Sequence, residues 1–112
     1  LRDPSSGCEW TKSQTSKTLL PFILEEAQEL SDAFENKDTQ NFKEELGDLL
    51  LQIVLQSKIA EENDLFSFDE VIDNLCEKLI RRHPYVFKEK RSHTIEEQRE
   101  AYFRIKDLEK LK

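Results

Sequence analysis

Apolar residues recur every three or four positions along most of this chain, and no segment shows the alternation that is typical of a half-buried strand. This spacing predicts amphipathic helices: a first from about Ser16, and a second and longest from about Thr39 to Glu62, with a loop at 36–38 between them. The apolar positions are Leu19, Ile23, Ala27, Leu30 and Phe34 in the first helix, and Phe42, Leu46, Leu49, Leu50, Ile53, Val54 and Ala60 in the second. The fold class is therefore predicted to be all-α.

Two capping-box sequences, S-F-D-E at 67–70 and T-I-E-E at 94–97, predict the starts of two further helices. Pro84 ends the first of these at about Arg82, because the residue before a proline is pushed out of the helical region. Their apolar stripes are Val71, Ile72, Leu75, Cys76, Leu79 and Ile80, and then Ala101, Tyr102, Ile105 and Leu108. The prediction is one four-helix, bundle-like domain over residues 1–112, entered through an N-terminal loop over residues 1–15.

Two features of the helices lead to further expectations. Pro21 is compatible with the first helix only in its first turn, where a backbone N–H is not needed. The second helix is apolar on two sides, so we expect the domain to complete its core as a homodimer.

The chain contains no Met and begins with a bulky Leu1, so we expect it to be cut from a longer polypeptide.

Composition excludes several classes of function. The 24 acidic against 17 basic residues give a net charge of −7, which disfavours binding to a nucleic acid polymer or an anionic membrane. Two glycines are too few for the loops that bind phosphate through backbone N–H groups. The longest apolar run, 49–55, is too short to span a membrane. Cys8 and Cys76 are best interpreted as free thiols, which favours a cytoplasmic protein.

Acidic residues lie inside the apolar faces of the first two helices. At about 100° per residue, Glu26 falls within the buried arc of the first helix and Glu29 lies at its edge. In the second helix, Glu45 and Asp48 begin a narrow polar stripe with apolar residues on both sides. A stripe bounded in this way is predicted to face the interior.

These four carboxylates need a positive partner. Burying unpaired carboxylates costs several kcal/mol each, and close like charges add to that cost. Carboxylates three residues apart share one side of a helix, so two such pairs can converge between packed helices. Oxygen ligands without His or Cys favour Mg²⁺, with Mn²⁺ as a second choice. Glu25 and Glu44 are expected to lie outside the apolar arcs, on solvated faces.

The basic residues and the single tryptophan leave alternatives open. Lys78, Arg81 and Arg82 near a helix C-terminus either cap that helix or bind phosphate oxygens. Trp10 lies in the N-terminal loop, as a core residue or as a platform on which a base stacks. His83 and His93 are expected to be structural or solvated.

Several segments together resemble the MazG nucleoside triphosphate pyrophosphohydrolases. They are L-R-D-P-S-S-G-C-E-W at 1–10, Gln14-Thr15, E-E-A-Q-E at 25–29, E-E-L-G-D-L-L-L-Q at 44–52, K-L-I-R-R-H-P-Y-V-F at 78–87 and Ile105-Lys106. The resemblance implies an all-α, dimeric, Mg²⁺-dependent enzyme that hydrolyses nucleoside triphosphates to monophosphate and pyrophosphate. It implies these metal ligands: Glu26, Glu29, Glu45 and Asp48. It also implies phosphate contacts by Lys78, Arg81 and Arg82, and nucleotide contacts by Trp10 and Lys106.

The chain departs from the family pattern near the tryptophan. Glu9, Thr11 and Ser16 stand where the family tends to have Pro, Asp and His, and Tyr102 stands where Trp is common. These changes bear on nucleotide selectivity and on the level of activity, not on the metal ligands.

The reaction that the resemblance implies is an attack of water on the α-phosphorus. Glu25 or Glu44 is expected either to act as general base or to orient the metal-bound water, and the sequence does not decide between them. Two other functions remain open at this point. The chain could be a non-catalytic helical dimerisation or nucleotide-sensing module, or its acids could be neutralised by its own Arg and Lys in a purely structural core.

Overall fold

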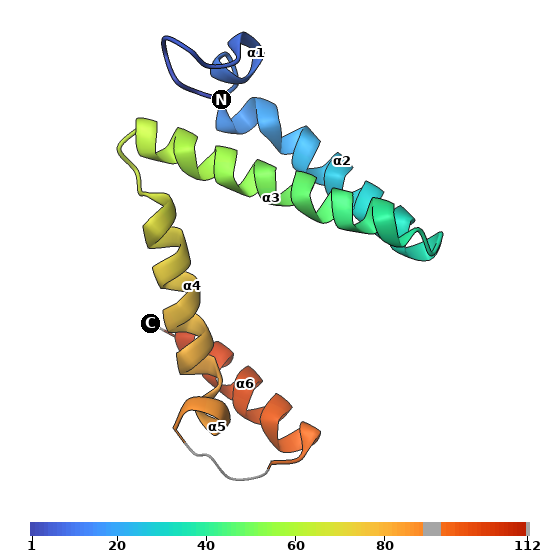
Figure 1. Ribbon diagram of the computed structural model, residues 1–112. Helices are drawn as coiled ribbons and strands as arrows, with labels where there is room; N and C mark the ends of the chain where they lie inside the picture. The colour runs from blue at the N-terminus through green and yellow to red at the C-terminus, as the bar shows by residue number, and fades with distance from the viewer. Residues whose placement is uncertain (89–92, 112) are drawn as a thin grey trace. The chain divides into compact units, whose positions relative to one another are not determined.

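The computed structural model describes residues 1–88 and 93–111, and within these ranges every regular element is a helix. The elements are α1 (Glu9–Lys12), α2 (Ser16–Glu35), α3 (Thr39–Glu62), α4 (Phe68–Arg82), α5 (Pro84–Phe87) and α6 (Ile95–Lys110) (Figure 1). The all-α prediction is confirmed, and the four long helices begin and end close to their predicted bounds. No helix in the described ranges is both long and apolar enough to cross a membrane.

The chain divides into two compact units, Leu1–Phe68 and Asp69–Lys112. In the first unit α2 and α3 form a hairpin and lie side by side along their length (Figure 1). Its small apolar core consists of Leu19, Leu55 and Ile59, with Phe22 packed against them. The hairpin therefore brings the middle of α2 next to the middle of α3, where the acidic residues lie.

Side-chain caps set the start of both hairpin helices. Thr15 and Thr18 form a reciprocal capping box at the start of α2, and the Asp38 carboxylate accepts a hydrogen bond from Asn41 N at 3.1 Å at the start of α3. The turn between the helices includes Lys37 with a φ of 56°, a left-handed conformation that closes the connection in few residues. These local features set where each helix starts and how the two are joined.

Pro21 is not in the first turn of α2, so that prediction is wrong. The helix begins at Ser16, which makes Pro21 its sixth residue. A residue there would normally donate to the carbonyl four positions earlier, and proline cannot. Both Lys17 and Pro21 are exposed, so water can satisfy the carbonyl that is left without its helical donor.

The N-terminal segment is an ordered loop that contains the short helix α1, which sequence analysis did not anticipate. Gly7 N donates to Asp3 O at 2.9 Å and Cys8 N donates to Leu1 O at 2.8 Å. The Asp3 carboxylate accepts hydrogen bonds from Ser5 and Ser6, and these bonds lower the pKa of Asp3 to about 2. Residues 1–8 thus form a compact loop that leads into α1.

The second unit is held largely by polar contacts. The predicted capping box at the start of α6 is confirmed, with Thr94 and Glu97 as partners. Arg81 and Arg82, at the end of α4, both pair with Glu109 of α6. None of the described residues of α4, α5 and α6 is fully buried, and the apolar stripe of α4 is about half exposed. Cys8 and Cys76 are free and exposed, as predicted.

The two glycines should respond to alanine in opposite directions. A Cβ at Gly7 would lie 2.6 Å from Asp3 O and against Leu1 O, whereas a Cβ at Gly47 would meet nothing within 4 Å. We expect Gly7→Ala to lower the free energy of unfolding by about 1–3 kcal/mol. Gly47→Ala should raise it by roughly 0.5–1 kcal/mol, because alanine favours a helix interior. Urea denaturation of both variants measures this, and equal effects would contradict the described packing.

Candidate metal centre

Three carboxylates meet between α2 and α3. Glu26 and Glu29 lie one turn apart on α2, and Glu45 faces them from α3. Each offers a carboxylate oxygen, and these three oxygens lie within 4.8 Å of one another. Opposite ligands around Mg²⁺ are about 4.2 Å apart, so the acidic cluster, as we call these three residues, is only slightly wider than an octahedral site.

The acidic cluster is partly withdrawn from water. Glu45 is only 9% exposed, and Glu26 and Glu29 are half-buried. Glu26 Oε2 and Glu45 Oε2 are buried, and neither has a hydrogen-bond partner among the described residues. A buried carboxylate oxygen without a donor is costly, so these atoms favour either a proton held between neighbouring carboxyl groups or a bound cation. A divalent cation fits oxygen ligands and satisfies both atoms at once.

No basic side chain in the described ranges neutralises the acidic cluster. The ion pairs formed there by Arg and Lys involve other carboxylates, such as Glu62, Glu61 and Glu109. This finding argues against the alternative that these acids form a structural core with the chain's own Arg and Lys. Hard oxygen ligands arranged in this way can hold a divalent metal ion.

Proximity and burial shift the pKa values of all three carboxyl groups in the same direction. Burial raises the pKa of Glu26, and the charges of Glu29 and Asp48 contribute further. A proton shared with Glu26 raises the pKa of Glu45, and one shared with Glu45 raises the pKa of Glu29. Without a cation, the carboxyl groups satisfy one another only by holding a proton between them.

Asp48 lies outside the three-residue cluster. It is exposed, contrary to the prediction that it faces the interior, because it lies about 60° around α3 from Glu45. Its charge still contributes to the raised pKa of Glu26 and of Glu45, so it is a near neighbour of both carboxylates. Its role as a fourth ligand stays a prediction.

The two candidate general bases are exposed, as their positions on the helices predict. Glu44 Oε1 accepts a hydrogen bond from Gln40 Nε2 at 3.4 Å, one turn earlier on α3. The charge of Glu25 adds to the raised pKa of both Glu26 and Glu29, so it acts on the acidic cluster from its edge. The choice between Glu25 and Glu44 as base is not decided by these contacts.

The predicted phosphate-binding residues belong to the second unit. Lys78 lies on α4 and Lys106 on α6, and both are half-buried. The Glu109 carboxylate forms ion pairs with both arginines, from Oε2 to Arg81 Nη2 at 3.0 Å and from Oε1 to Arg82 Nη2 at 2.9 Å. It also raises the pKa of Arg82. Tyr102 contributes a hydroxyl 3.4 Å from Arg82 Nη1. The two guanidinium groups thus already hold one anionic group.

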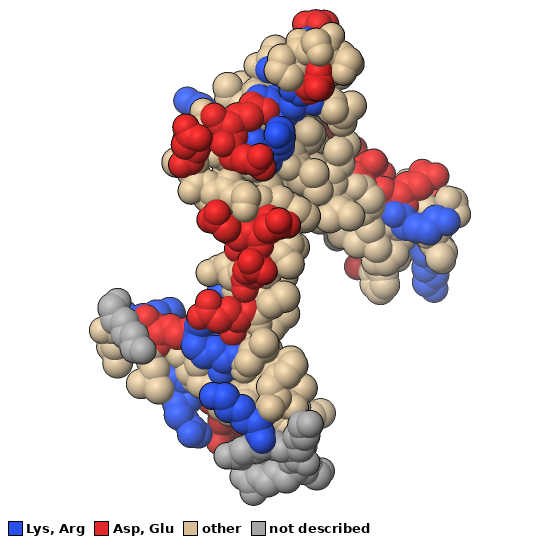
Figure 2. Space-filling view, turned by 60° about the vertical axis from the view of Figure 1, so that its left-hand side comes forward, with Lys and Arg blue, Asp and Glu red and all other residues tan. Residues whose placement is uncertain are grey.

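On the face shown in Figure 2, Lys and Arg side chains lie among Asp and Glu side chains in both units. A surface that binds a nucleic acid backbone carries clustered basic residues along one face or helix. The mixed pattern of the visible face is unlike such a surface. The expectation that the chain does not bind a nucleic acid polymer stays a prediction.

Trp10 lies on α1 with 52% of its surface exposed, so it is not the core residue that one alternative proposed. Its ring meets that of Phe22 on α2 edge to face, with 5.5 Å between ring centroids. The indole is thus held by an aromatic neighbour while about half of its surface stays open to solvent, which leaves it available for stacking with a planar group.

Sequence reasoning missed three residues, Arg2, Glu62 and Glu109, that hold the N-terminal segment and the arginines of α4 in place. Arg2 pairs with Glu62 at 2.6 Å across 60 positions of sequence, and Glu109 joins two arginines of another helix. No periodicity or motif spacing could have found these pairs, because their partners lie on different elements. The only signal was the presence of Arg2 in the segment 1–10 on which the resemblance rests.

The fold and the acidic cluster define an all-helical class of protein with a carboxylate site between two antiparallel helices. Residues 14–87 match the family model described as the MazG nucleotide pyrophosphohydrolase domain. The chain belongs to this family. Its structure is also similar to the crystal structure of a mazG-related protein from Thermotoga maritima, with a TM-score of 0.79, 27% identity, and coverage of 90% of this chain and 88% of that one.

Several curated relatives have names that describe an activity, among them one from Thermotoga maritima and one from Escherichia coli. The chain is 51% identical over 87 residues to the nucleoside triphosphate pyrophosphohydrolase/pyrophosphatase MazG of Thermotoga maritima, covering 78% of this chain and 34% of that protein. It is 39% identical over 110 residues to the nucleoside triphosphate pyrophosphohydrolase of Escherichia coli K12, covering 98% of this chain and 42% of that protein. The chain therefore spans less than half the length of these relatives.

The acidic cluster should destabilise the metal-free protein. The raised pKa values mean that the folded state keeps protons that the unfolded chain releases, so stability falls as pH rises above the ordinary pKa of glutamate. We expect Glu45→Gln to raise the melting temperature in EDTA at neutral pH, because the amide removes one charge and can donate to Glu26. The exposed Glu44→Gln is the control and should change the melting temperature little. A lower melting temperature for Glu45→Gln would contradict the described geometry.

Proposed function

We propose that this chain hydrolyses nucleoside triphosphates to nucleoside monophosphate and pyrophosphate in a Mg²⁺-dependent reaction. The observation that carries the proposal is the acidic cluster, three converging carboxylates with two buried oxygens that lack partners. Family membership and the names of the curated relatives support the reaction type. We further propose a cytoplasmic role in removing non-canonical or excess nucleotides, carried out by one domain over residues 1–112.

Each residue of the proposed site has a distinct role. Glu26, Glu29 and Glu45, with Asp48, would hold Mg²⁺ or Mn²⁺, which supplies charge neutralisation at phosphate oxygens and lowers the pKa of bound water. Glu25 or Glu44 accepts a proton from the water that attacks the α-phosphorus. Lys78, Arg81 and Arg82 bind phosphate oxygens and offset the charge that develops on the departing pyrophosphate. Trp10 and Lys106 contact the nucleotide.

Glu109 adds a requirement to this scheme. Its carboxylate occupies both Arg81 and Arg82, so a phosphate group must compete with it for the same N–H donors. Phosphate carries more charge than a carboxylate and offers more acceptor oxygens, so it can displace Glu109 from at least one guanidinium. Glu109 also keeps the two arginines oriented before substrate arrives.

Product analysis tests the proposed reaction. The full chain is incubated with Mg²⁺ and each common or modified nucleoside triphosphate, and chromatography separates monophosphate plus pyrophosphate from diphosphate plus phosphate. We expect the first pair, and we expect Glu45→Gln to reduce its formation by roughly 10²–10³-fold, since a metal ligand contributes several kcal/mol to the transition state. Glu35→Gln, at the exposed end of α2, should retain activity. Triphosphate that stays bound and intact would favour the nucleotide-sensing module instead.

We also propose that the chain acts as a homodimer. The apolar residues of α3 that its own unit leaves open include Leu46, Leu50, Leu51, Ile53 and Val54, each between 41% and 57% exposed. This is a continuous apolar face on a helix that also carries Glu45. A second copy would remove it from water, and burial of apolar surface is the main driving force of stable association.

Sedimentation tests the dimer. We expect the native chain to sediment as a dimer of about twice 13.3 kDa, and Leu50→Glu with Val54→Glu to sediment as a monomer. Ile95→Glu is the control, because Ile95 is 80% exposed at the first position of α6, where an acidic residue is favourable. A native chain that sediments as a monomer at micromolar concentration would contradict the proposal.

A further inference from the structure

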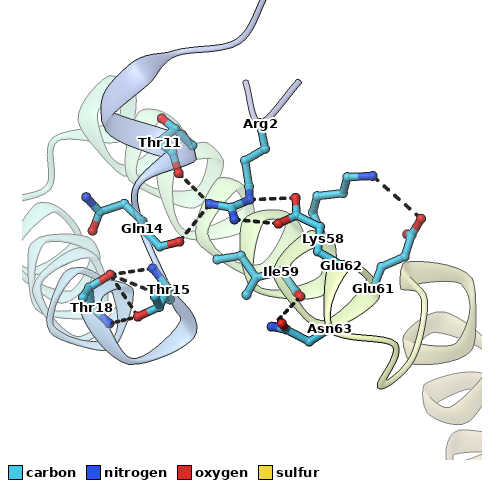
Figure 3. A network of polar contacts seen from close by, with 10 residues as sticks. All are labelled: Arg2, Thr11, Gln14, Thr15, Thr18, Lys58, Ile59, Glu61, Glu62 and Asn63. Atoms are coloured by element: carbon cyan, nitrogen blue, oxygen red, sulfur yellow. Dashed lines mark hydrogen bonds and ion pairs between the residues drawn. The ribbon is translucent and has the colours of Figure 1, made fainter. Parts of the chain in front are cut away.

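The Arg2 guanidinium lies between the end of α3 and the segment 11–14, and all of its nitrogens donate (Figure 3). Nε and Nη2 bind the two carboxylate oxygens of Glu62, at the end of α3, at 3.0 and 2.6 Å. Nη1 binds Thr11 O at 2.6 Å and Gln14 O at 3.0 Å. The Arg2 side chain is only 9% exposed, so this is a nearly buried set of charge-assisted hydrogen bonds.

The carbonyl groups that Arg2 binds are those that end helix α1. Thr11 is in the last turn of α1, and Gln14 lies just beyond its C-cap. A helix of four residues is far below the length at which a helix is stable in water, so its position depends on contacts with the rest of the unit. A cation at its C-terminal carbonyls, itself fixed by Glu62 of α3, supplies such a contact.

Helix α1 carries Trp10, and the Trp10 ring contacts Phe22 of α2. Phe22 precedes Glu26 by four residues and Glu29 by seven, so all three lie on one face of α2. Four residues advance a helix by about 6 Å. Phe22 is therefore about one helical turn from Glu26 along α2, and the half-exposed indole packs against Phe22, so a nucleotide with its base on Trp10 can extend its phosphates along this face toward the acidic cluster.

We propose that Arg2 and Glu62 form a clamp that positions Trp10 for stacking on the base of the nucleotide, and that the clamp thereby sets affinity for the nucleotide rather than the rate of the chemical step. Arg2 and Glu62 are positioning residues, since neither is placed against the reacting atoms. The proposal rests on the proposed function, because it takes the base of that substrate as the ligand of Trp10.

Lysine cannot replace Arg2 in this clamp. Its single ammonium nitrogen cannot span both Glu62 oxygens and two carbonyls, whereas the planar guanidinium does so with fixed geometry. Neutralising Glu62 also leaves a nearly buried guanidinium without its counter-charge, which weakens the link that Arg2 makes between the end of α1 and the end of α3.

Two variants and a matched control test the clamp. Glu62→Gln and Arg2→Lys each weaken it. Glu61→Gln removes the adjacent carboxylate, which pairs with Lys58 at 3.7 Å and does not touch Arg2. Trp10 is the only tryptophan, so acrylamide quenching of its fluorescence reports its position directly, without any need for hydrolysis. KM and kcat are measured on the triphosphate that the native chain hydrolyses fastest.

For Glu62→Gln and Arg2→Lys we expect quenching of Trp10 to become clearly easier and KM to rise about fivefold or more, the loss of roughly 1 kcal/mol of base stacking. The kcat at saturating nucleotide should stay within about twofold, and helicity by circular dichroism should be unchanged. Glu61→Gln should match the native chain in every measurement. This KM-only effect is one that a general loss of structure would not produce.

Other results would overturn the clamp. If quenching of Trp10 is unchanged in both variants, Arg2 and Glu62 do not position it. If quenching increases but KM does not, Trp10 does not hold the base. If KM rises, kcat falls and helicity is lost in both variants, the pair is only structural. A native chain that releases no pyrophosphate overturns the proposed function instead, and the quenching and a fluorescence titration with ATP still decide the clamp.

Discussion

Mutual repulsion among three carboxylates between two packed helices is the constraint on which the rest of this structure depends. Glu26, Glu29 and Glu45 approach within 4.8 Å, and two of their oxygens are buried without partners. A hairpin built only for stability would place leucine there, since burying like charges opposes packing. The small apolar core of Leu19, Leu55 and Ile59 has to hold the helices together against this repulsion. The acidic cluster is therefore best explained by a cation that removes the repulsion.

The N-terminal segment complements the acidic cluster in the same unit. It begins with a loop closed by its own backbone hydrogen bonds and continues into a four-residue helix that cannot stand alone. The pair of Arg2 and Glu62 ties this segment to the end of α3 (Figure 3), and the Trp10 ring contacts Phe22 of α2. Phe22, which the Trp10 ring contacts, thus shares one face of α2 with Glu26 and Glu29, and the position of Trp10 depends on contacts that local sequence does not fix.

The sequence was informative where the controlling interactions are local. The helical period and the caps placed the long helices, because the first turn and the apolar face are decided within a few residues, as with Thr94 and Glu97. The same period identified Glu26, Glu29 and Glu45. The helical period wrongly placed Asp48 in the interior. The period of an isolated helix does not show how far around that helix its neighbour covers it. The period also could not predict the ion pairs of Arg2 with Glu62 and of Arg81 with Glu109, since no local pattern identifies a partner on another element.

The most direct test of the account is to locate a divalent ion in the protein. Crystals grown with Mn²⁺ and measured at the manganese absorption edge give an anomalous peak at each bound ion, without reference to any activity. The account predicts a peak between α2 and α3, at coordination distance from Glu26, Glu29 and Glu45, and its absence in Glu45→Gln. A peak elsewhere, or three carboxylates that stay together with no ion between them, would contradict the claim that this cluster is a metal site.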